Sequence, residues 1–270
     1  MNEIREGQSI ELLKELHILT KDGKMNQDSR RKLKQVYHLC QFIAPLIEEV
    51  GVDVTLIDHG AGKSYLGFIL YDLYLKKLIG KKHIYGIESR DDLVLKSKDL
   101  AKKCNFFNMS FLNLTVEQSI LSESIPKEID IVTALHACNT ATDDAIHFAL
   151  LKKATHIVLV PCCQAEVASV LRKNKNKELS KSALSEIWRH PIHTREFGGH
   201  LTNVLRCLQL EAHGYQVTVT ELVGWEHSMK NELIIATYKD LPRKKSSERL
   251  TQILNELGIL ELQDRFFINL

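Results

Sequence analysis

The sequence has no uninterrupted apolar run of about 18 residues, so it lacks a candidate transmembrane helix. Residues 1–19 are polar and acidic, without the basic start and apolar run of a signal peptide. Six cysteines form no CxxC pair and two are adjacent, which fits reduced thiols better than a disulfide framework. A net charge of only +2 argues against nucleic-acid binding through bulk charge alone. These absences predict a protein with no membrane span and no export, and cytoplasm is the default compartment.

What is present indicates a folded globular protein that begins with helices. Hydrophobic residues make up 44% and charged residues 26% of the 270 positions, as in an ordinary globular domain with one main core. Apolar side chains recur at helical spacing over residues 9–19 and 29–50, and Gly51 is placed to end the second helix. Pro45 predicts a kink or a break near Ala44.

After Gly51 the pattern changes to short β-branched runs separated by helical stretches. The predicted strands are 54–58, 83–88, 109–114, 130–135 and 156–160, and their alternation with helices predicts a parallel α/β sheet. Runs 215–223 and 232–239 are separated by too few residues for a helical crossover, so they should form an antiparallel hairpin. Five parallel strands closed by such a hairpin are the layout of a Rossmann-like class I methyltransferase sheet. The predicted parts are a helical region (1–50), the sheet domain (51–240) with a helical insertion or lid (166–212), and a helical tail (241–270).

The loop after the first predicted strand, Asp58-His59-Gly60-Ala61-Gly62-Lys63-Ser64-Tyr65, is typical of a ligand site. Glycines let the backbone approach a ligand at the mouth of the sheet. A nucleoside triphosphate loop would need glycine at Ile57, and a dinucleotide fingerprint would need glycine at Tyr65, so both fit poorly. S-adenosylmethionine fits better, because its sites pair such a loop with an acid at the second strand's end, where Glu88 stands. The predicted cofactor-binding residues are Asp58, Gly60, Ala61, Gly62, Tyr65, Glu88, Asn113, Thr115 and Leu135.

Two more segments follow the fourth and fifth predicted strands and should border the same crevice. They read TALHACNTATD (133–143) and VPCCQAE (160–166). Together with DHGAGKSYLGF they resemble a methyltransferase family that includes the methyltransferase domain of glutathione S-transferase C-terminal domain-containing protein. More distantly they resemble the acceptor-stem tRNA 2′-O-methyltransferases, which carry His-Leu-Cys-Gly-x-Ala-Thr-Asp and Cys-Cys-His segments. Here Asn139 and Gln164 replace the glycine and the histidine, and the zinc-finger cysteines of those enzymes are missing.

The predicted catalytic residues lie in these two segments: His136, Cys138, Asp143, Cys162 and Cys163. His136 would stand beside the methyl acceptor and hold or deprotonate it, or else simply bond to backbone at a strand end. Asp143 would orient the imidazole of His136. Alternatively, either Asp143 or Thr142 would cap the next helix. The three cysteines leave open a mechanism in which a thiolate adds to a pyrimidine ring, although no adjacent cation would lower the pKa of a thiol. Alternatively, the cysteines are present because small residues pack closely at the ligand crevice.

Three basic clusters offer phosphate contacts if two of them flank the crevice: Lys24 with Arg30, Arg31, Lys32 and Lys34; Lys76, Lys77, Lys81 and Lys82; and Arg172, Lys173, Lys175 and Lys177. Residues 193–200 are interpreted as a mobile lid or an interhelical loop. No metal is expected, although His190, His193 and His200 leave zinc as a minor alternative. The favoured hypothesis is an S-adenosylmethionine-dependent methyltransferase of RNA, with tRNA as the narrower candidate. A methyltransferase of a small molecule or protein and a non-catalytic cofactor-binding scaffold stay open, and the oligomeric state is undetermined.

Overall fold

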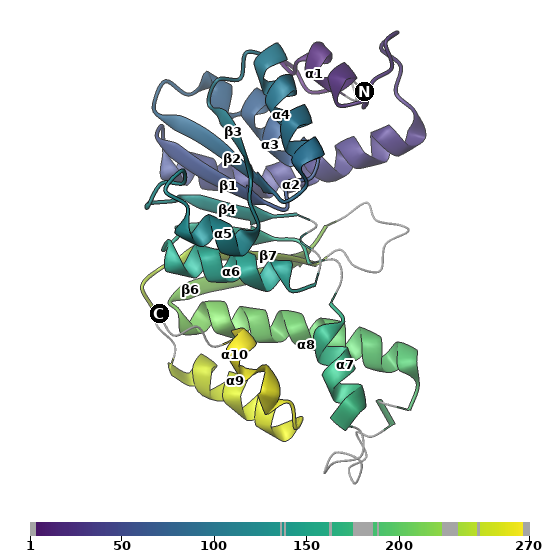
Figure 1. The fold of residues 1–270 in the computed structure, drawn as a ribbon, viewed down its shortest axis with the longest axis vertical. Helices are drawn as coiled ribbons and strands as arrows, with labels where there is room; N and C mark the ends of the chain where they lie inside the picture. Colours follow the sequence, from purple (N-terminus) through teal and green to yellow (C-terminus); the bar gives the residue numbers. More distant parts are fainter. Residues whose placement is uncertain are drawn as a thin grey trace.

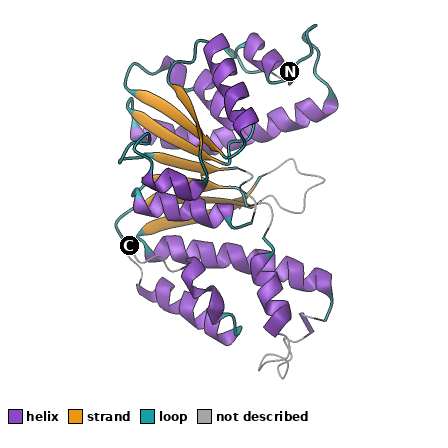
Figure 2. Cartoon of the chain, viewed as in Figure 1, coloured by secondary structure: helices purple, strands orange, loops and turns teal. Residues whose placement is uncertain are grey.

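A computed structural model describes residues 4–135, 137, 139–161, 164–174, 186–187, 189–222, 232–241 and 244–266. Within them, a seven-stranded sheet lies between helices (Figure 2). The strands are β1 (Val54–His59), β2 (Lys82–Glu88), β3 (Met109–Asn113), β4 (Ile131–Ala134), β5 (His156–Leu159), β6 (Tyr215–Glu221) and β7 (Glu232–Tyr238). The helices are α1 (Ile10–Glu15), α2 (Gln27–Val50), α3 (Tyr65–Leu73), α4 (Asp91–Lys103), α5 (Val116–Leu121), α6 (Ala141–Leu151), α7 (Glu166–Lys173), α8 (Pro191–Ala212), α9 (Lys244–Glu256) and α10 (Gln263–Phe266), with short 3-10 turns η1 (Leu75–Lys77) and η5 (Leu260–Leu262).

The order of strands across the sheet is β3-β2-β1-β4-β5-β7-β6. The first five strands are parallel, and β7 is antiparallel to both β5 and β6. This confirms the predicted class I methyltransferase sheet. Because parallel strands all end at one edge, the loops after β1, β2, β4 and β5 lie at the same edge and form one ligand-facing side.

The two faces of the sheet bury separate hydrophobic cores. On one face, α1 to α4 pack their apolar stripes, which include Leu33, Phe68 and Val94, against the strands. On the other face, α6 and the second half of α8 do the same through Ile146, Phe148 and other side chains. Figure 1 shows α5 and α6 in front of the sheet. Helices on both faces explain why the central strands β1, β4 and β5 are almost entirely buried.

The N-terminal helices differ from the prediction in two places. Helix α2 continues through Pro45 as a single 24-residue helix, and the predicted break at Ala44 is wrong. A proline removes one backbone donor and strains a helix, but here the buried face of α2, including Leu39, Ile43 and Ile47, keeps it against the core. Helix α1 is shorter than predicted and ends at Glu15, just before His17, whose φ of +55° is left-handed. Gly51 ends α2 as predicted.

A third core joins α7 and α8 to the C-terminal helices. Val167 and Leu171 of α7 pack with Leu205 of α8 and with Leu254 and Phe266 near the end of the chain. In Figure 1, α9 and α10 lie beside α8, and α7 crosses its N-terminal half. The predicted insertion (166–212) and the predicted tail (241–270) therefore pack against each other in their described parts.

Residues 193–200 are helical, so their interpretation as a mobile lid or a loop is wrong. That interpretation took the paired glycines, Gly198 and Gly199, as a sign of a flexible segment. A Cβ on Gly198 would lie only 2.7 Å from the Cβ of Ala168 and 2.8 Å from its backbone. Gly198 is therefore needed for the close crossing of α7 and α8 rather than for a turn.

No described helix is long and apolar enough to cross a membrane. Among the described side chains, no group of three His, Cys, Asp or Glu residues is arranged to hold a metal ion. His190 and His193 are neighbours in the first turn of α8, with ring centroids 5.2 Å apart.

Candidate active site

The loop between β1 and α3 owes its shape to three left-handed residues. Gly60, Gly62 and Ser64 have φ values of +63°, +57° and +53°. The amide of Ala61 donates to the carbonyl of Ile87 in β2, with 3.1 Å between nitrogen and oxygen. Glycine adopts such backbone angles without strain, and its missing side chain leaves the loop amides accessible. The spacing of the two glycines is thus explained by the backbone itself.

Glu88, the last residue of β2, fixes this loop from the side. Its carboxylate accepts hydrogen bonds from the amide of Gly62 (2.8 Å) and from the amide and side chain of Arg90 (3.0 to 3.2 Å). Burial alone would raise the pKa of Glu88, but these hydrogen bonds outweigh it and the pKa is lowered. Glu88 is therefore an ionised acceptor at the place where the sequence predicted one.

A cavity of about 390 Å³ opens beside the glycine loop at the carboxyl ends of β1 and β4. Three cationic side chains line it, Lys32 of α2, Lys63 of the loop and Arg90 after β2. Asp58, the fifth residue of β1, is the one acid among its described lining residues. The described lining residues are Lys32, Gln35, Val36, Leu39, Asp58, Gly60, Ala61, Gly62, Lys63, Tyr65, Leu66, Arg90, Leu135 and Leu222.

Asp58 is buried at 3% exposure and accepts a hydrogen bond from the Thr133 hydroxyl at 2.7 Å. Burial raises the pKa of Asp58 to about 7, although the Thr133 hydrogen bond opposes the shift. The next residue, His59, is also buried, and burial lowers its pKa to about 3, so its ring is neutral. The cavity therefore contains a carboxyl group that changes charge near neutral pH.

The other predicted cofactor residues occupy two kinds of position. Ala61, Tyr65 and Leu135 line the cavity together with Asp58 and the two glycines. Asn113 ends β3 and donates its side-chain amide to the Ser89 carbonyl at 3.0 Å, so it holds the end of β2 in place. Thr115 caps α5 in a capping box with Gln118, which gives it a structural role. Neither Asn113 nor Thr115 lines the described cavity.

These features suit S-adenosylmethionine, the cofactor expected from the sequence. The open glycine loop admits a ligand close to its backbone. Glu88 does not itself line the cavity, but its ionised carboxylate bonds to Gly62 and to the exposed Arg90, which do. Asp58 lies deeper in the same cavity, where an anion would complement a cationic amino group. When bound, this cofactor would supply an electrophilic methyl group. The chain's own residues would hold its ribose at Glu88 and its amino-acid end near Asp58.

On the acceptor side, the loops after β4 and β5 are held by a buried network centred on α8. Arg206 is 1% exposed and makes two hydrogen bonds with the Asp143 carboxylate, at 2.7 and 2.8 Å. It also donates to the backbone carbonyl of Asn139 at 3.1 Å. An arginine fork matches a carboxylate in this way, so Arg206 ties Asn139 to the first turn of α6.

Asn203, one helical turn before Arg206, extends this network to the next loop. Its side-chain oxygen accepts from Gln164 (2.7 Å) and Arg206 (3.2 Å), and its amide donates to Glu232 of β7 (2.8 Å). Asn139 has a left-handed φ of +53°, and its side-chain oxygen accepts from the Ala165 amide at 3.3 Å. The two departures from the tRNA enzymes, Asn139 and Gln164, are therefore both part of one structural network.

Asp143 is the only predicted catalytic residue whose side chain is described. It is paired with Arg206 in the first turn of α6, and the predicted capping role for Asp143 or Thr142 is wrong, because α6 begins at Ala141. Thr142 instead donates to the Ala137 carbonyl at 2.6 Å. His136, Cys138, Cys162 and Cys163 lie outside the described residues. Of the other cysteines, Cys40 and Cys207 have pKa values raised to about 12 by burial.

Sequence reasoning missed several residues of the site. Gln35, Arg90 and Leu222 line the cavity, and Asn203 and Arg206 anchor the acceptor loops. Only Arg90 carried a usable signal, because it lies two positions after the predicted acid.

Of the three basic clusters, the first reaches the cavity through Lys32. The second is at the opposite edge of the sheet, because Lys82 begins β2 while Glu88 ends it. The third is described only at Arg172 and Lys173, in the last turn of α7.

A family model for a methyltransferase domain matches residues 31–170, which are about half of the chain. Among curated proteins, the glutathione S-transferase C-terminal domain-containing protein of Bos taurus is 24% identical over 232 residues. Its Mus musculus counterpart is 23% identical over the same length. In both cases the match covers 80% of this chain and 34% of the relative, so the chain spans about a third of the length of these curated relatives.

The solved structures that match this chain have low sequence identity to it. Magnesium protoporphyrin IX methyltransferase from Synechocystis PCC 6803, with bound SAH, is 13% identical with a TM-score of 0.47, over 84% of this chain and 94% of the other. TrmK of M. capricolum in complex with SAH is 12% identical with a TM-score of 0.46, over 84% and 93% of the two chains.

Proposed function

Because the chain belongs to the methyltransferase domain family, we propose that it transfers a methyl group from S-adenosylmethionine to RNA, with tRNA as the first RNA to test. The family match confirms the predicted enzyme class and, with it, the methyl donor expected for that class. The identity of the acceptor is the proposed part.

One observation supports an RNA acceptor most directly. The cavity at the glycine loop has three cations, Lys32, Lys63 and Arg90, against the single buried acid Asp58. Arg90 is paired with Glu88, whereas Lys32 and Lys63 make no ion pair with any described residue. Lysines at the mouth of a site position a nucleic acid by its phosphates without reading its bases. A neutral small molecule would gain nothing from them.

Different residues at this edge of the sheet would bind the cofactor, hold the acceptor and position the acceptor loop. Glu88 would hold the ribose hydroxyls, and the amides freed by Gly60 and Gly62 would approach the cofactor closely. His136 follows the cavity-lining Leu135, where it would hold or deprotonate the acceptor. Arg206 and Asp143 do not need to touch substrate. They would keep the loop that carries His136 in one position.

The proposal is tested first by calorimetric titration with S-adenosylmethionine and S-adenosylhomocysteine, for the wild type and for Glu88→Ala. Both compounds should bind the wild type, and Glu88→Ala should weaken binding by about 1–3 kcal/mol, the usual cost of losing a charged hydrogen-bond partner. Asp92→Ala is the matched control, since Asp92 is an exposed acid nearby whose ion pair is with Lys96 rather than with the glycine loop.

The second step incubates the enzyme with radiolabelled methyl donor and total tRNA, ribosomal RNA, or a cell extract cleared of RNA. Label in an RNA fraction supports the proposal. Label only in the cleared extract identifies a small-molecule or protein acceptor instead. Cofactor binding without label in any fraction favours the non-catalytic scaffold, and no cofactor binding overturns the methyltransferase assignment for this chain.

A further inference from the structure

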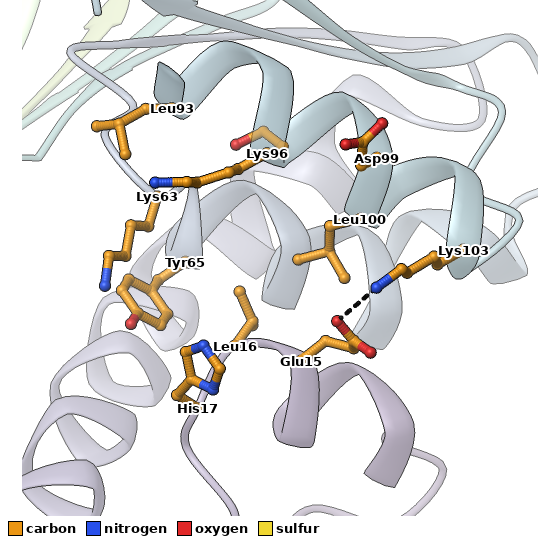
Figure 3. Close-up of a pocket in the computed structure, with 11 residues that line it drawn as sticks. Glu15, Leu16, His17, Lys63, Tyr65, Leu93, Lys96, Asp99, Leu100 and Lys103 are labelled. Atoms are coloured by element: carbon orange, nitrogen blue, oxygen red, sulfur yellow. Dashed lines mark hydrogen bonds and ion pairs between the residues drawn. The ribbon is translucent and has the colours of Figure 1, made fainter.

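A second cavity of about 350 Å³ lies on the outer side of the glycine loop, between the end of α1 and one face of α4 (Figure 3). Leu16, Leu93 and Leu100 give it an apolar floor, and Tyr65 and His17 add two rings on one side. Its polar residues are Glu15, Lys63, Lys96, Ser97, Asp99 and Lys103. No step of the proposed reaction uses this cavity.

Three lysines surround this cavity from two different elements. Lys96 and Lys103 are two helical turns apart on α4, and Lys63 comes from the glycine loop. Lys103 pairs with Glu15 at 3.2 Å (Figure 3), and Lys96 pairs with Asp92 at 3.2 Å. Both pairs are exposed to water, with 74% of the Lys96 side chain and 63% of the Lys103 side chain accessible. Exposed pairs of this kind contribute little, so both ammonium groups can exchange their partner for another anion.

The two cavities adjoin at the glycine loop, because Lys63 and Tyr65 line both of them. With the cofactor in the first cavity, the second cavity stays open to a different ligand beside Lys63. An RNA strand that crosses the mouth of the cofactor cavity would place a backbone phosphate in the second cavity, whereas a single nucleotide at the acceptor loop would not reach it.

We propose that the cavity between α1 and α4 binds a backbone phosphate of an RNA strand whose reacting nucleotide lies outside the cofactor cavity, at the acceptor loop after β4. Lys63, Lys96 and Lys103 contact the phosphate region, and Tyr65 and His17 lie beside the adjoining sugar or base. This inference rests on the RNA acceptor proposed above and adds the path that the strand follows.

The test measures fluorescence polarisation of a labelled single-stranded 15-mer RNA at several salt concentrations. The test variant is Lys96→Ala with Lys103→Ala. The matched control is Lys98→Ala with Lys102→Ala, which removes the same charge from α4 but from residues that do not line the cavity. S-adenosylhomocysteine affinity is measured for every variant, since none of these four lysines lines the cofactor cavity.

The test variant should bind RNA on the order of tenfold more weakly, and the slope of log affinity against log salt should fall by about 1 to 1.5. The control should change affinity by less than about twofold, and S-adenosylhomocysteine affinity should not change. A third variant acts in the opposite direction. Asp99→Asn removes a carboxylate from the cavity wall, so it should strengthen RNA binding by about twofold.

Equal losses in the test and control variants would overturn the proposal, because they would indicate bulk charge rather than a site. Absence of RNA binding by the wild-type protein would also overturn the proposal. If that protein still binds S-adenosylhomocysteine, the methyltransferase assignment is unaffected. A nucleoside monophosphate that competes as strongly as the 15-mer would show a free-nucleotide site and would also overturn the strand path.

Discussion

The two halves of the sheet hold their ligand-facing loops by different physical means. At β1 and β2, left-handed backbone at Gly60 and Gly62 and one carboxylate, Glu88, define the loop, and all three lie within 29 residues of sequence. At β4 and β5, Asp143 and Gln164 are held by Asn203 and Arg206, roughly 40 to 60 residues further along.

This difference explains how each half would respond to change. The cofactor half depends on backbone shape and on hydrogen bonds at a partly open cavity, so its variants should lose binding and keep the fold. The acceptor half depends on a buried ion pair, so its variants should lose stability first. Four experiments test that contrast.

The largest effect is expected for Arg206→Ala. It leaves the Asp143 carboxylate buried without its partner, so the free energy of unfolding should fall by about 3–5 kcal/mol. Urea denaturation measures it. Arg195→Ala is the control on the same helix, since its pair with Glu196 is exposed and should contribute about 0–1 kcal/mol. A loss below about 1 kcal/mol for Arg206→Ala would contradict the structural role of the network.

Next in size is the pH dependence caused by Asp58. Its folded pKa of about 7 is raised above the unfolded value, so the protonated group stabilises the fold at low pH and this stability is lost as pH rises from about 4 to 7. The loss amounts to at most about 4 kcal/mol. Denaturation of the wild type and Asp58→Asn at pH 5 and pH 8 measures it. The wild type should lose stability relative to the variant at the higher pH, and parallel curves would contradict the raised pKa.

A smaller effect is expected for Glu88→Ala, and it should appear in binding rather than in stability. S-adenosylhomocysteine affinity should fall by about 1–3 kcal/mol, while stability should fall by less than for Arg206→Ala, because Glu88→Ala leaves no buried charge unpaired: the Arg90 side of the pair is exposed. Calorimetry and denaturation of the same preparation compare the two quantities. A large loss of stability with unchanged S-adenosylhomocysteine affinity would contradict the expectation that variants of the cofactor half lose binding and keep the fold.

The smallest effect separates two roles for Thr115. As the cap of α5, Thr115→Ala should cost about 0.5–2 kcal/mol of stability and leave cofactor affinity unchanged. Thr115→Ser keeps the hydroxyl and should restore the stability. If both variants weaken S-adenosylhomocysteine binding alone, the original prediction of a cofactor contact is correct.

The sequence was sufficient for five parallel strands closed by an antiparallel hairpin, for the glycine loop and for the position of Glu88, because β-branched runs, glycine spacing and strand ends are local signals. It could not show Arg206, since an arginine in a polar helical stretch resembles a solvated side chain until its distant partner is known. Gly198 was misread for a similar reason, because its contact with Ala168 is tertiary. At Pro45 a local signal predicted a helix break that does not occur, because burial of the surrounding helix outweighs the local cost of the proline.

The packing of α9 and α10 against α7 has a consequence for the order in which the chain can fold during synthesis. Arg265 donates two hydrogen bonds, from Nε and Nη2, to the Glu166 carboxylate, and Phe266 completes the core that α7 and α8 share. The helices that follow β1 to β3 can pack against these strands while the rest of the chain is still in the ribosome. The acceptor side must wait until residue 266 has emerged, so it spends longest with exposed apolar surface and is the part where chaperones would act.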